Sequence, residues 1–209
     1  MKFNSLAIAA ALGLTATAQP TNSCIPAVPT PETFGVIAIR SGSGVQNSGF
    51  NAALGSIFAG LPKQNATCAG SDDGFATFYI QDEGLYLYGP SNKTQQVYVD
   101  RSGMGMAYPS LCPSCTPVLT DDIGQGNIGY TSGESTPRNA EVSGWAIKNN
   151  YLEFDGSGLI ACPNSIGGAY SIWLSAGIDN PAGNSDCVGI AGRVEKAEKP
   201  VRCTYTASS

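Results

Sequence analysis

The chain of 209 residues is acidic, with a formal net charge of −5, and it contains no histidine and no basic run. Its negative charge would repel phosphate backbones and anionic lipids, so we expect no nucleic-acid partner and no membrane. The lack of histidine excludes Ser-His-Asp and Cys-His mechanisms and imidazole metal sites. Charged residues make up only 13% of the chain and glycine occurs 26 times, as is typical of a turn-rich secreted β protein.

Residues 1–18 have the features of a secretory signal peptide. Lys2 supplies a positive end, Leu6 to Leu14 form a short apolar run, and Ala16-Thr17-Ala18 is a small-residue cleavage site. Residues 204–209 lack the hydrophobic tail of a GPI signal. We therefore expect a secreted, extracellular protein without a lipid anchor.

The next segment, residues 19–33, is a Pro-rich N-terminal tail. Its prolines break strand ladders and favour an extended chain. From Phe34 onward, short alternating runs predict strands. We expect a single all-β domain over residues 34–209, with a long irregular connection at 108–144 in which only residues 127–130 suggest a strand.

Two segments of this domain echo each other. The first has apolar runs at 78–80, 85–88 and 97–99, and the second runs from residue 145 to 177. Phe78 and Leu85 have the same spacing as Trp145 and Leu152, and each segment predicts three consecutive antiparallel strands. A lone three-stranded sheet cannot bury its apolar face, so we expect the two meanders to pack against each other.

These patterns predict an all-β fold with no substantial helix in the mature chain. Both an antiparallel β-barrel and a two-sheet β-sandwich would satisfy the pattern of short strands and turns.

The first meander also has a distinctive outer face. Period-two alternation places its Phe, Ile, Leu and Val side chains on one face, so its tyrosines share the other. These tyrosines are Tyr79, Tyr86, Tyr88 and Tyr98. Grouped on one sheet face they form a candidate sugar platform, because each ring offers an apolar plane and a hydroxyl. The alternative is that loops cover this face and that the tyrosines are packing residues.

The chain has 7 cysteines, and in an oxidising compartment most should pair. The disulfide candidates are Cys68, Cys112, Cys115, Cys162, Cys187 and Cys203. Cys24, in the tail, is the candidate free thiol. The Cys112-Pro113-Ser114-Cys115 run resembles a redox motif, but it lies in a Pro-rich segment and not at a helix N-terminus. A structural loop disulfide is therefore the better interpretation of that pair.

Two sequons, at Asn65 and Asn92, are candidate glycosylation sites because each lies in a turn-rich break between strands. The G-x-G-x-x-G letters at 124–129 lack the strand before and the helix after that a dinucleotide site needs. We expect no cofactor and no metal.

Carboxylate pairs are the remaining enzymatic option, because glycoside hydrolysis uses two acids across a cleft. Adjacent acids occur at 72–73, 82–83 and 121–122, and Asp100 and Asp155 are more distant candidates. The adjacent pairs are typical of turns, and no spacing distinguishes an acid from a nucleophile. We therefore assign no catalytic residue.

Several segments carry a family resemblance. They are Ala38-Ile39-Arg40-Ser41-Gly42-Ser43, residues 60–68, Gln96-Val97-Tyr98-Val99-Asp100-Arg101-Ser102-Gly103-Met104-Gly105, residues 158–163 and residues 201–205. They resemble the PhiA-type fungal cell-wall proteins over nearly the whole chain from Phe34. The resemblance implies two disulfide bridges among Cys68, Cys162, Cys187 and Cys203. Cys24 and the insertion that holds Cys112 and Cys115 depart from the family pattern.

The resemblance implies a secreted ascomycete wall protein, of a kind linked to phialide and conidium development and noted as IgE-binding. We interpret the chain as a non-enzymatic structural protein of the cell wall that binds wall polysaccharide or a wall protein. The alternative is a secreted elicitor perceived by a host receptor, as similar proteins from plant pathogens are. A glycoside hydrolase is the third hypothesis.

Overall fold

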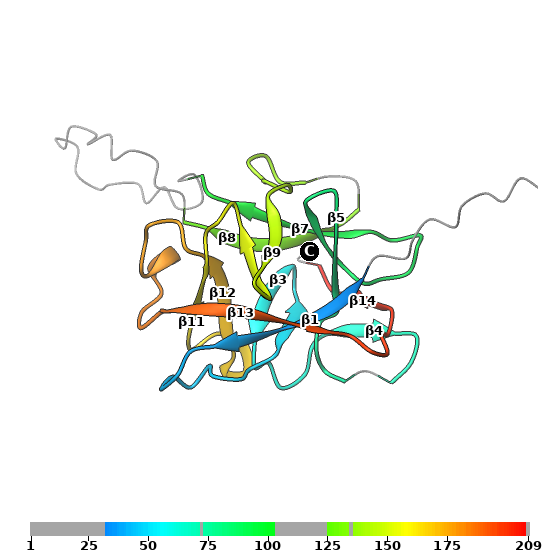
Figure 1. The fold of residues 1–209 in the computed structure, drawn as a ribbon, viewed down its shortest axis with the longest axis horizontal. Helices are drawn as coiled ribbons and strands as arrows, with labels where there is room; N and C mark the ends of the chain where they lie inside the picture. The colour runs from blue at the N-terminus through cyan, green and yellow to red at the C-terminus, as the bar shows by residue number, and fades with distance from the viewer. Residues whose placement is uncertain (1–31, 72, 103–124, 134–135, 208–209) are drawn as a thin grey trace, which may run out of the picture. The chain divides into compact units, whose positions relative to one another are not determined.

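The computed structural model describes residues 32–71, 73–102, 125–133 and 136–207, which all belong to one compact unit, Pro31–Ser209 (Figure 1). Within these residues the structure is built of strands and two short 3₁₀ helices, so the predicted all-β class is confirmed. The strands are β1 (Thr33–Ile39), β2 (Phe50–Ala53), β3 (Ser56–Ala59), β4 (Ala66–Cys68), β5 (Phe78–Gln81), β6 (Gly84–Leu87), β7 (Gln95–Asp100), β8 (Asn127–Ser132), β9 (Trp145–Lys148), β10 (Tyr151–Phe154), β11 (Leu159–Cys162), β12 (Tyr170–Leu174), β13 (Val188–Lys196) and β14 (Cys203–Tyr205). The 3₁₀ helices are η2 (Ile166–Gly168) and η3 (Pro181–Gly183).

The main sheet is antiparallel, and its pairings return to their starting point. β1 pairs with β5 along one edge and with β13 along the other, and Figure 1 shows β1 in blue beside β13 in orange. From β5 the path runs through β6, β7, β8, β12 and β11 to β13. This closed path favours the barrel of the two predicted architectures. β4 and β14 form a second, two-stranded sheet.

The tight hairpins of the sheet explain several polar pairs in the sequence. The connections β2–β3, β5–β6 and β9–β10 turn on Leu54-Gly55, Asp82-Glu83 and Asn149-Asn150, and all these residues have φ between 50° and 75°. Two positive φ angles define the type I′ turn, which matches the twist of the flanking strands. The acidic pair at 82–83 is therefore a hairpin turn.

Side chains from both predicted meanders meet in one core. Leu85 and Leu152, at equivalent positions in the two echoing segments, are 1% and 4% exposed and line the same small internal space. The predicted packing of the two apolar faces is confirmed. Other members of this core are Phe78, Val97, Val99, Trp145, Phe154, Leu159 and Ile172.

The first meander has the predicted pairing, and the second does not. β5, β6 and β7 pair in succession, whereas β10 pairs with β9 and β13 and has no pairing with β11 or β12. The prediction of three consecutive strands in the second segment is thus wrong. The reason is the length of β13, which pairs first with β11 and then with β10 along one edge. Gly192 lets β13 lie close to the Leu159 side chain of β11, because a Cβ at Gly192 would lie 3.0 Å from Leu159 Cδ1.

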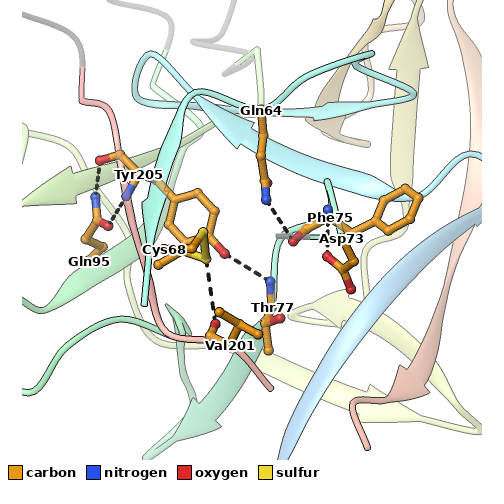
Figure 2. The surroundings of a disulfide bond; sticks show 9 residues. Gln64, Cys68, Asp73, Phe75, Thr77, Gln95, Val201 and Tyr205 are labelled. Carbon is orange, nitrogen blue, oxygen red and sulfur yellow. Dashed lines mark hydrogen bonds between the residues drawn. A yellow bond between two sulfur atoms is a disulfide. The ribbon is translucent and has the colours of Figure 1, made fainter. Parts of the chain in front are cut away.

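The C-terminal strand is joined to β4 by a disulfide and to the main sheet by buried hydrogen bonds (Figure 2). Cys203 of β14 is bonded to Cys68 of β4. Gln95 Nε2 donates to the Tyr205 carbonyl, and the Tyr205 N–H donates to Gln95 Oε1, both at 2.8 Å. The Thr77 N–H donates to the Tyr205 hydroxyl at 3.2 Å. These bonds explain how Gln95 is tolerated at 1% exposure, because a buried amide is costly unless its hydrogen bonds are made.

Candidate functional site

The strongest candidate site is the outer face of the first meander, which we call the tyrosine wall: Tyr79, Tyr86, Tyr88 and Tyr98. Tyr79 lies on β5, Tyr86 on β6 and Tyr98 on β7, and Tyr88 directly follows β6. Their strand neighbours Phe78, Leu85, Leu87, Val97 and Val99 are buried. All four tyrosines are half-buried, so part of each ring or hydroxyl faces solvent.

Three of the rings contact one another in a row, Tyr86–Tyr79–Tyr88, which we call the stack. Tyr79 and Tyr86 are cross-strand partners with parallel rings, whose centroids are 5.1 Å apart at an interplanar angle of 16°. The Tyr88 ring meets Tyr79 edge-on at 6.5 Å, and the Arg202 guanidinium lies 5.1 Å from the centroid of Tyr88. Each aromatic pair contributes about 0.5–1.5 kcal/mol beyond burial. The stack is therefore preorganised before any ligand arrives.

Polar side chains continue the row across the sheet. The cross-strand register places Tyr79 beside Tyr86, Tyr86 beside Gln96, and Gln96 beside Thr131 of β8. Gln96 Nε2 donates to the Tyr86 hydroxyl at 3.1 Å. Aromatic planes next to amide and hydroxyl groups are the combination that a polyhydroxylated ligand requires.

Two glycines on the outer face give the rings room to lie along the sheet. A Cβ at Gly84 would lie 2.9 Å from Tyr86 Cε2, and a Cβ at Gly129 would lie 2.5 Å from the Tyr98 hydroxyl oxygen. Both glycines are buried, although their side of the strand faces outward. The tyrosine rings themselves cover these positions. Sequence reasoning missed the role of these glycines, and the available signal was a glycine at an outward-facing strand position.

Tyr98 lies apart from the stack. Among the ring pairs of the described residues none includes Tyr98, which instead covers Gly129 on β8. Burial raises the pKa of Tyr98 above its ordinary value, and the nearby Asp100 carboxylate raises it further. Burial likewise raises the pKa of Tyr79, with a smaller contribution from Tyr86. Both hydroxyls are therefore neutral hydrogen-bond donors and acceptors through the acidic and neutral pH range.

The candidate carboxylates have local structural partners. Asp100 Oδ1 accepts from the Ser102 N–H at 2.8 Å and from the Ser102 hydroxyl at 2.6 Å. Asp155 Oδ2 accepts from Arg101 Nη2 at 3.1 Å, and Glu83 Oε2 accepts from the Ser143 hydroxyl at 2.9 Å. The pairs at 72–73 and 121–122 lie wholly or partly outside the described residues. Asp100 therefore stabilises a local turn, and Asp155 and Glu83 stabilise contacts between separate segments.

Arg101 joins the first meander to the β9–β10 hairpin. Its Nε donates to Glu141 Oε1 at 2.8 Å, and its Nη2 also pairs with Glu141. Its guanidinium lies 5.2 Å from the centroid of Phe154, at the end of β10. The hydrogen bond from Arg101 lowers the pKa of Glu141, more than burial raises it. Arg101 therefore acts as a clamp between two regions that are distant in sequence.

The structure places the remaining candidate residues as follows. Disulfides join Cys68 to Cys203 and Cys162 to Cys187, which are the four cysteines that the family resemblance singles out. Asn65 and Asn92 are both exposed. Cys24, Cys112 and Cys115 lie outside the described residues. The G-x-G-x-x-G letters run into strand β8, where a dinucleotide site would have a helix.

The described residues contain no group of three or more Cys, Asp or Glu side chains placed to hold a metal ion. The same part of the chain has no helix with the length and apolarity to span a membrane.

Comparison with known proteins identifies relatives over almost the full length. The family model described as PhiA-like secreted protein matches residues 34–110 and 114–206. The chain is 60% identical to cell wall protein phiA of Emericella nidulans, over 99% of this chain and 100% of that protein. It is 50% identical to cell wall protein phiA of Aspergillus fumigatus over 99% of this chain and 100% of that protein, and 35% identical to that of Arthroderma benhamiae over 86% of this chain and 90% of that protein. No solved structure matches the chain.

Proposed function

Because the chain belongs to the PhiA-like secreted protein family and is a secreted cell wall protein, we propose that it is a non-enzymatic structural component of that wall which binds neutral wall polysaccharide through its tyrosine wall. We include in the proposal a role in phialide and conidium development, which the family resemblance implies. Its tasks are placement and cohesion within the wall.

The observation that carries the proposal is the preorganised stack of Tyr79, Tyr86 and Tyr88 on a partly exposed sheet face. A stack that is already ordered loses little side-chain entropy when a ligand binds, which favours affinity for weakly interacting sugar rings. Tyrosine suits this task because a rigid ring provides apolar area and its hydroxyl provides a hydrogen bond. Burial raises the pKa of Tyr79, so its hydroxyl carries no charge that would repel or attract an ionic polymer.

The non-enzymatic part of the proposal is supported by the partners of the carboxylates. Glycoside hydrolysis needs one carboxyl whose pKa is raised, so that it can donate a proton at neutral pH. Glu141 has the opposite shift, because Arg101 stabilises its charged form. Asp155, one of the candidate carboxylates, forms an ion pair with the same Arg101, 3.1 Å between Oδ2 and Nη2.

Retention on insoluble β-glucan tests the proposal. The double variant Tyr86→Ala, Tyr88→Ala removes two members of the stack without touching the core, and we expect it to lose most of the retention seen for the unchanged protein. Tyr151→Ala is the matched control, because Tyr151 is a 41% exposed tyrosine on the outer side of β10. Equal retention of all three proteins would contradict the proposal.

Fractionation of the producing cells gives a second test. We expect most of the protein to stay with the wall until detergent or reductant is added. Recovery of the protein mainly as free material in the culture filtrate would instead favour the elicitor alternative.

A further inference from the structure

A second aromatic site lies on the outside of the sheet where β3, β8 and β12 meet. It is a groove of about 270 Å³, which we call the Trp173 groove. Its aromatic lining residues are Phe58 and Trp173, and its polar lining residues are Ser56, Asn127, Ser165, Ser171 and Asn184. None of these residues belongs to the tyrosine wall.

Trp173 is held in place with its ring toward the outside. Its strand neighbours Ile172 and Leu174 are 2% and 1% exposed and point into the core, so alternation sends Trp173 outward. Its indole Nε1 donates to the Ser171 hydroxyl at 3.0 Å, and its cross-strand partners are Asn127 on β8 and Ile160 on β11. The indole is half-buried, which leaves part of its surface open to the groove. An aromatic side chain that is fixed before binding is a suitable anchor for a ligand.

The lining defines the chemistry of the ligand. The described side chains that line the groove are hydroxyls, amides and apolar groups, and none of them is acidic or basic. Neutral donors and acceptors around one aromatic plane suit an uncharged polyhydroxylated ring. They offer no counter-charge to a phosphate, a carboxylate or an ammonium group, so an ionic ligand would lose solvation without gaining a partner.

The cross-strand register joins this groove to the tyrosine wall. Gly129 of β8 is the partner of both Tyr98 on β7 and Ser56 on β3, and Asn127 is the partner of both Asp100 and Trp173. Tyr98 and Trp173 are thus separated by two strand spacings and a two-residue offset, roughly 12 Å on the same outer surface. This distance exceeds one pyranose ring, so a ligand that contacts both must be an oligomer.

We propose that the Trp173 groove is a second subsite for the same neutral polysaccharide, so that the protein binds an extended polysaccharide chain and not a single sugar. The inference rests on the proposed function of the tyrosine wall and adds that the ligand must be longer than one sugar ring to contact both sites. The wall and the groove then act as two ends of one binding track that crosses β7 and β8.

Titration with linear β-1,3-linked glucose oligomers tests the inference. The unchanged protein should bind a hexasaccharide more tightly than a disaccharide, and binding of the longer oligomer should perturb tryptophan fluorescence. Of the 2 tryptophans in the chain, Trp145 is 2% exposed in the core, so a signal that disappears in Trp173→Phe belongs to the groove. Calorimetry supplies the affinities.

Trp173→Ala should lower hexasaccharide affinity roughly tenfold, about 1.4 kcal/mol for one lost stacking contact, and leave disaccharide affinity unchanged. Ser171→Ala, which removes only the hydroxyl that orients the indole, should give a smaller loss in the same direction. Ile166→Ala, at a 41% exposed apolar residue outside the groove lining, is the control and should bind normally.

The outcomes separate this inference from the proposed function. If Trp173→Ala, shown to be folded by its circular dichroism, binds the hexasaccharide as tightly as the unchanged protein while Tyr86→Ala, Tyr88→Ala does not, the second subsite is refuted and the tyrosine wall stands. If the unchanged protein binds no oligomer and no insoluble glucan, both proposals are wrong.

Discussion

The first meander and the β9–β10 hairpin are built on the same local pattern, yet their outer faces differ. Both turn on two residues with positive φ, and both send a leucine, Leu85 or Leu152, into the same core. Outside, the first meander carries the tyrosine stack, whereas the hairpin carries a Lys148–Glu153 ion pair and the exposed Tyr151. The inner face is dictated by packing in both regions, and the outer face is where a function can differ.

The largest predicted effect tests the equivalence of the two inner faces. Leu85→Ala and Leu152→Ala should each destabilise the protein by about 2–5 kcal/mol, because each removes a buried side chain and leaves a cavity in the shared core. Urea denaturation measures both. A cost below about 1 kcal/mol for one of them would show that its region does not belong to the cooperative core.

Two disulfides cross-link the described residues and close loops of different length. Cys68–Cys203, beside the first meander, spans 135 residues of sequence, and Cys162–Cys187 spans 25. On the chain-entropy model the longer loop gives about 1.5 kcal/mol more stabilisation. We expect Cys68→Ser, Cys203→Ser to lower the free energy of unfolding more than Cys162→Ser, Cys187→Ser does, and thermal unfolding of the purified variants measures this. The reverse order would refute the entropic explanation.

A smaller effect distinguishes the outer faces. Tyr79→Ala should cost about 1 kcal/mol or more, because Tyr79 contacts two other rings. Tyr151→Ala should change stability by less than about 0.5 kcal/mol, since its side chain is largely exposed. Equal losses of unfolding free energy in the two variants, measured by chemical denaturation, would show that the ring contacts of the stack do not stabilise the protein.

The smallest effect concerns the clamp between the two regions. The pKa of Glu141 is lowered in the folded state, so its contribution to stability is complete above the ordinary pKa of 4.5 and is lost as the pH falls through the folded-state value. The clamp is partly exposed, at 35% for Arg101 and 39% for Glu141, so solvent screens it and the effect is modest.

Glu141→Gln should therefore reduce the fall in melting temperature between pH 5 and pH 3, as measured by calorimetry. Glu195→Gln is the matched control, because Glu195 pairs with Arg193 on an exposed part of β13. A larger fall in melting temperature for Glu141→Gln than for the unchanged protein over this pH range would contradict the argument.

Much of this arrangement could be predicted from local patterns, and the rest depends on contacts between distant residues. Period-two alternation was sufficient to place Leu85 and Leu152 inside and the tyrosines outside. The insertion of β13 beside β10 could not be predicted, because alternation gives a strand its faces but not its neighbours. The Arg101–Glu141 and Gln95–Tyr205 bonds join residues 40 and 110 positions apart, and no sequence spacing specifies them.

The candidate site was predictable in part. The four tyrosines followed from alternation, but the stack and its support by Gly84 and Gly129 followed only from the register of β5 to β8. Trp173 was visible in the sequence as part of a strand. Its groove was not, because the serines and asparagines that line it come from separate strands and loops.

The most direct test of the tyrosine wall is to map a soluble β-1,3-glucose oligomer onto the protein by backbone and aromatic NMR shifts. We predict that the shifted signals will cluster at Tyr79, Tyr86, Tyr88 and Gln96, while Tyr151 on the opposite hairpin stays unchanged. Shifts centred on Tyr151, or no shifts at millimolar oligomer, would contradict the assignment of this face as the binding surface.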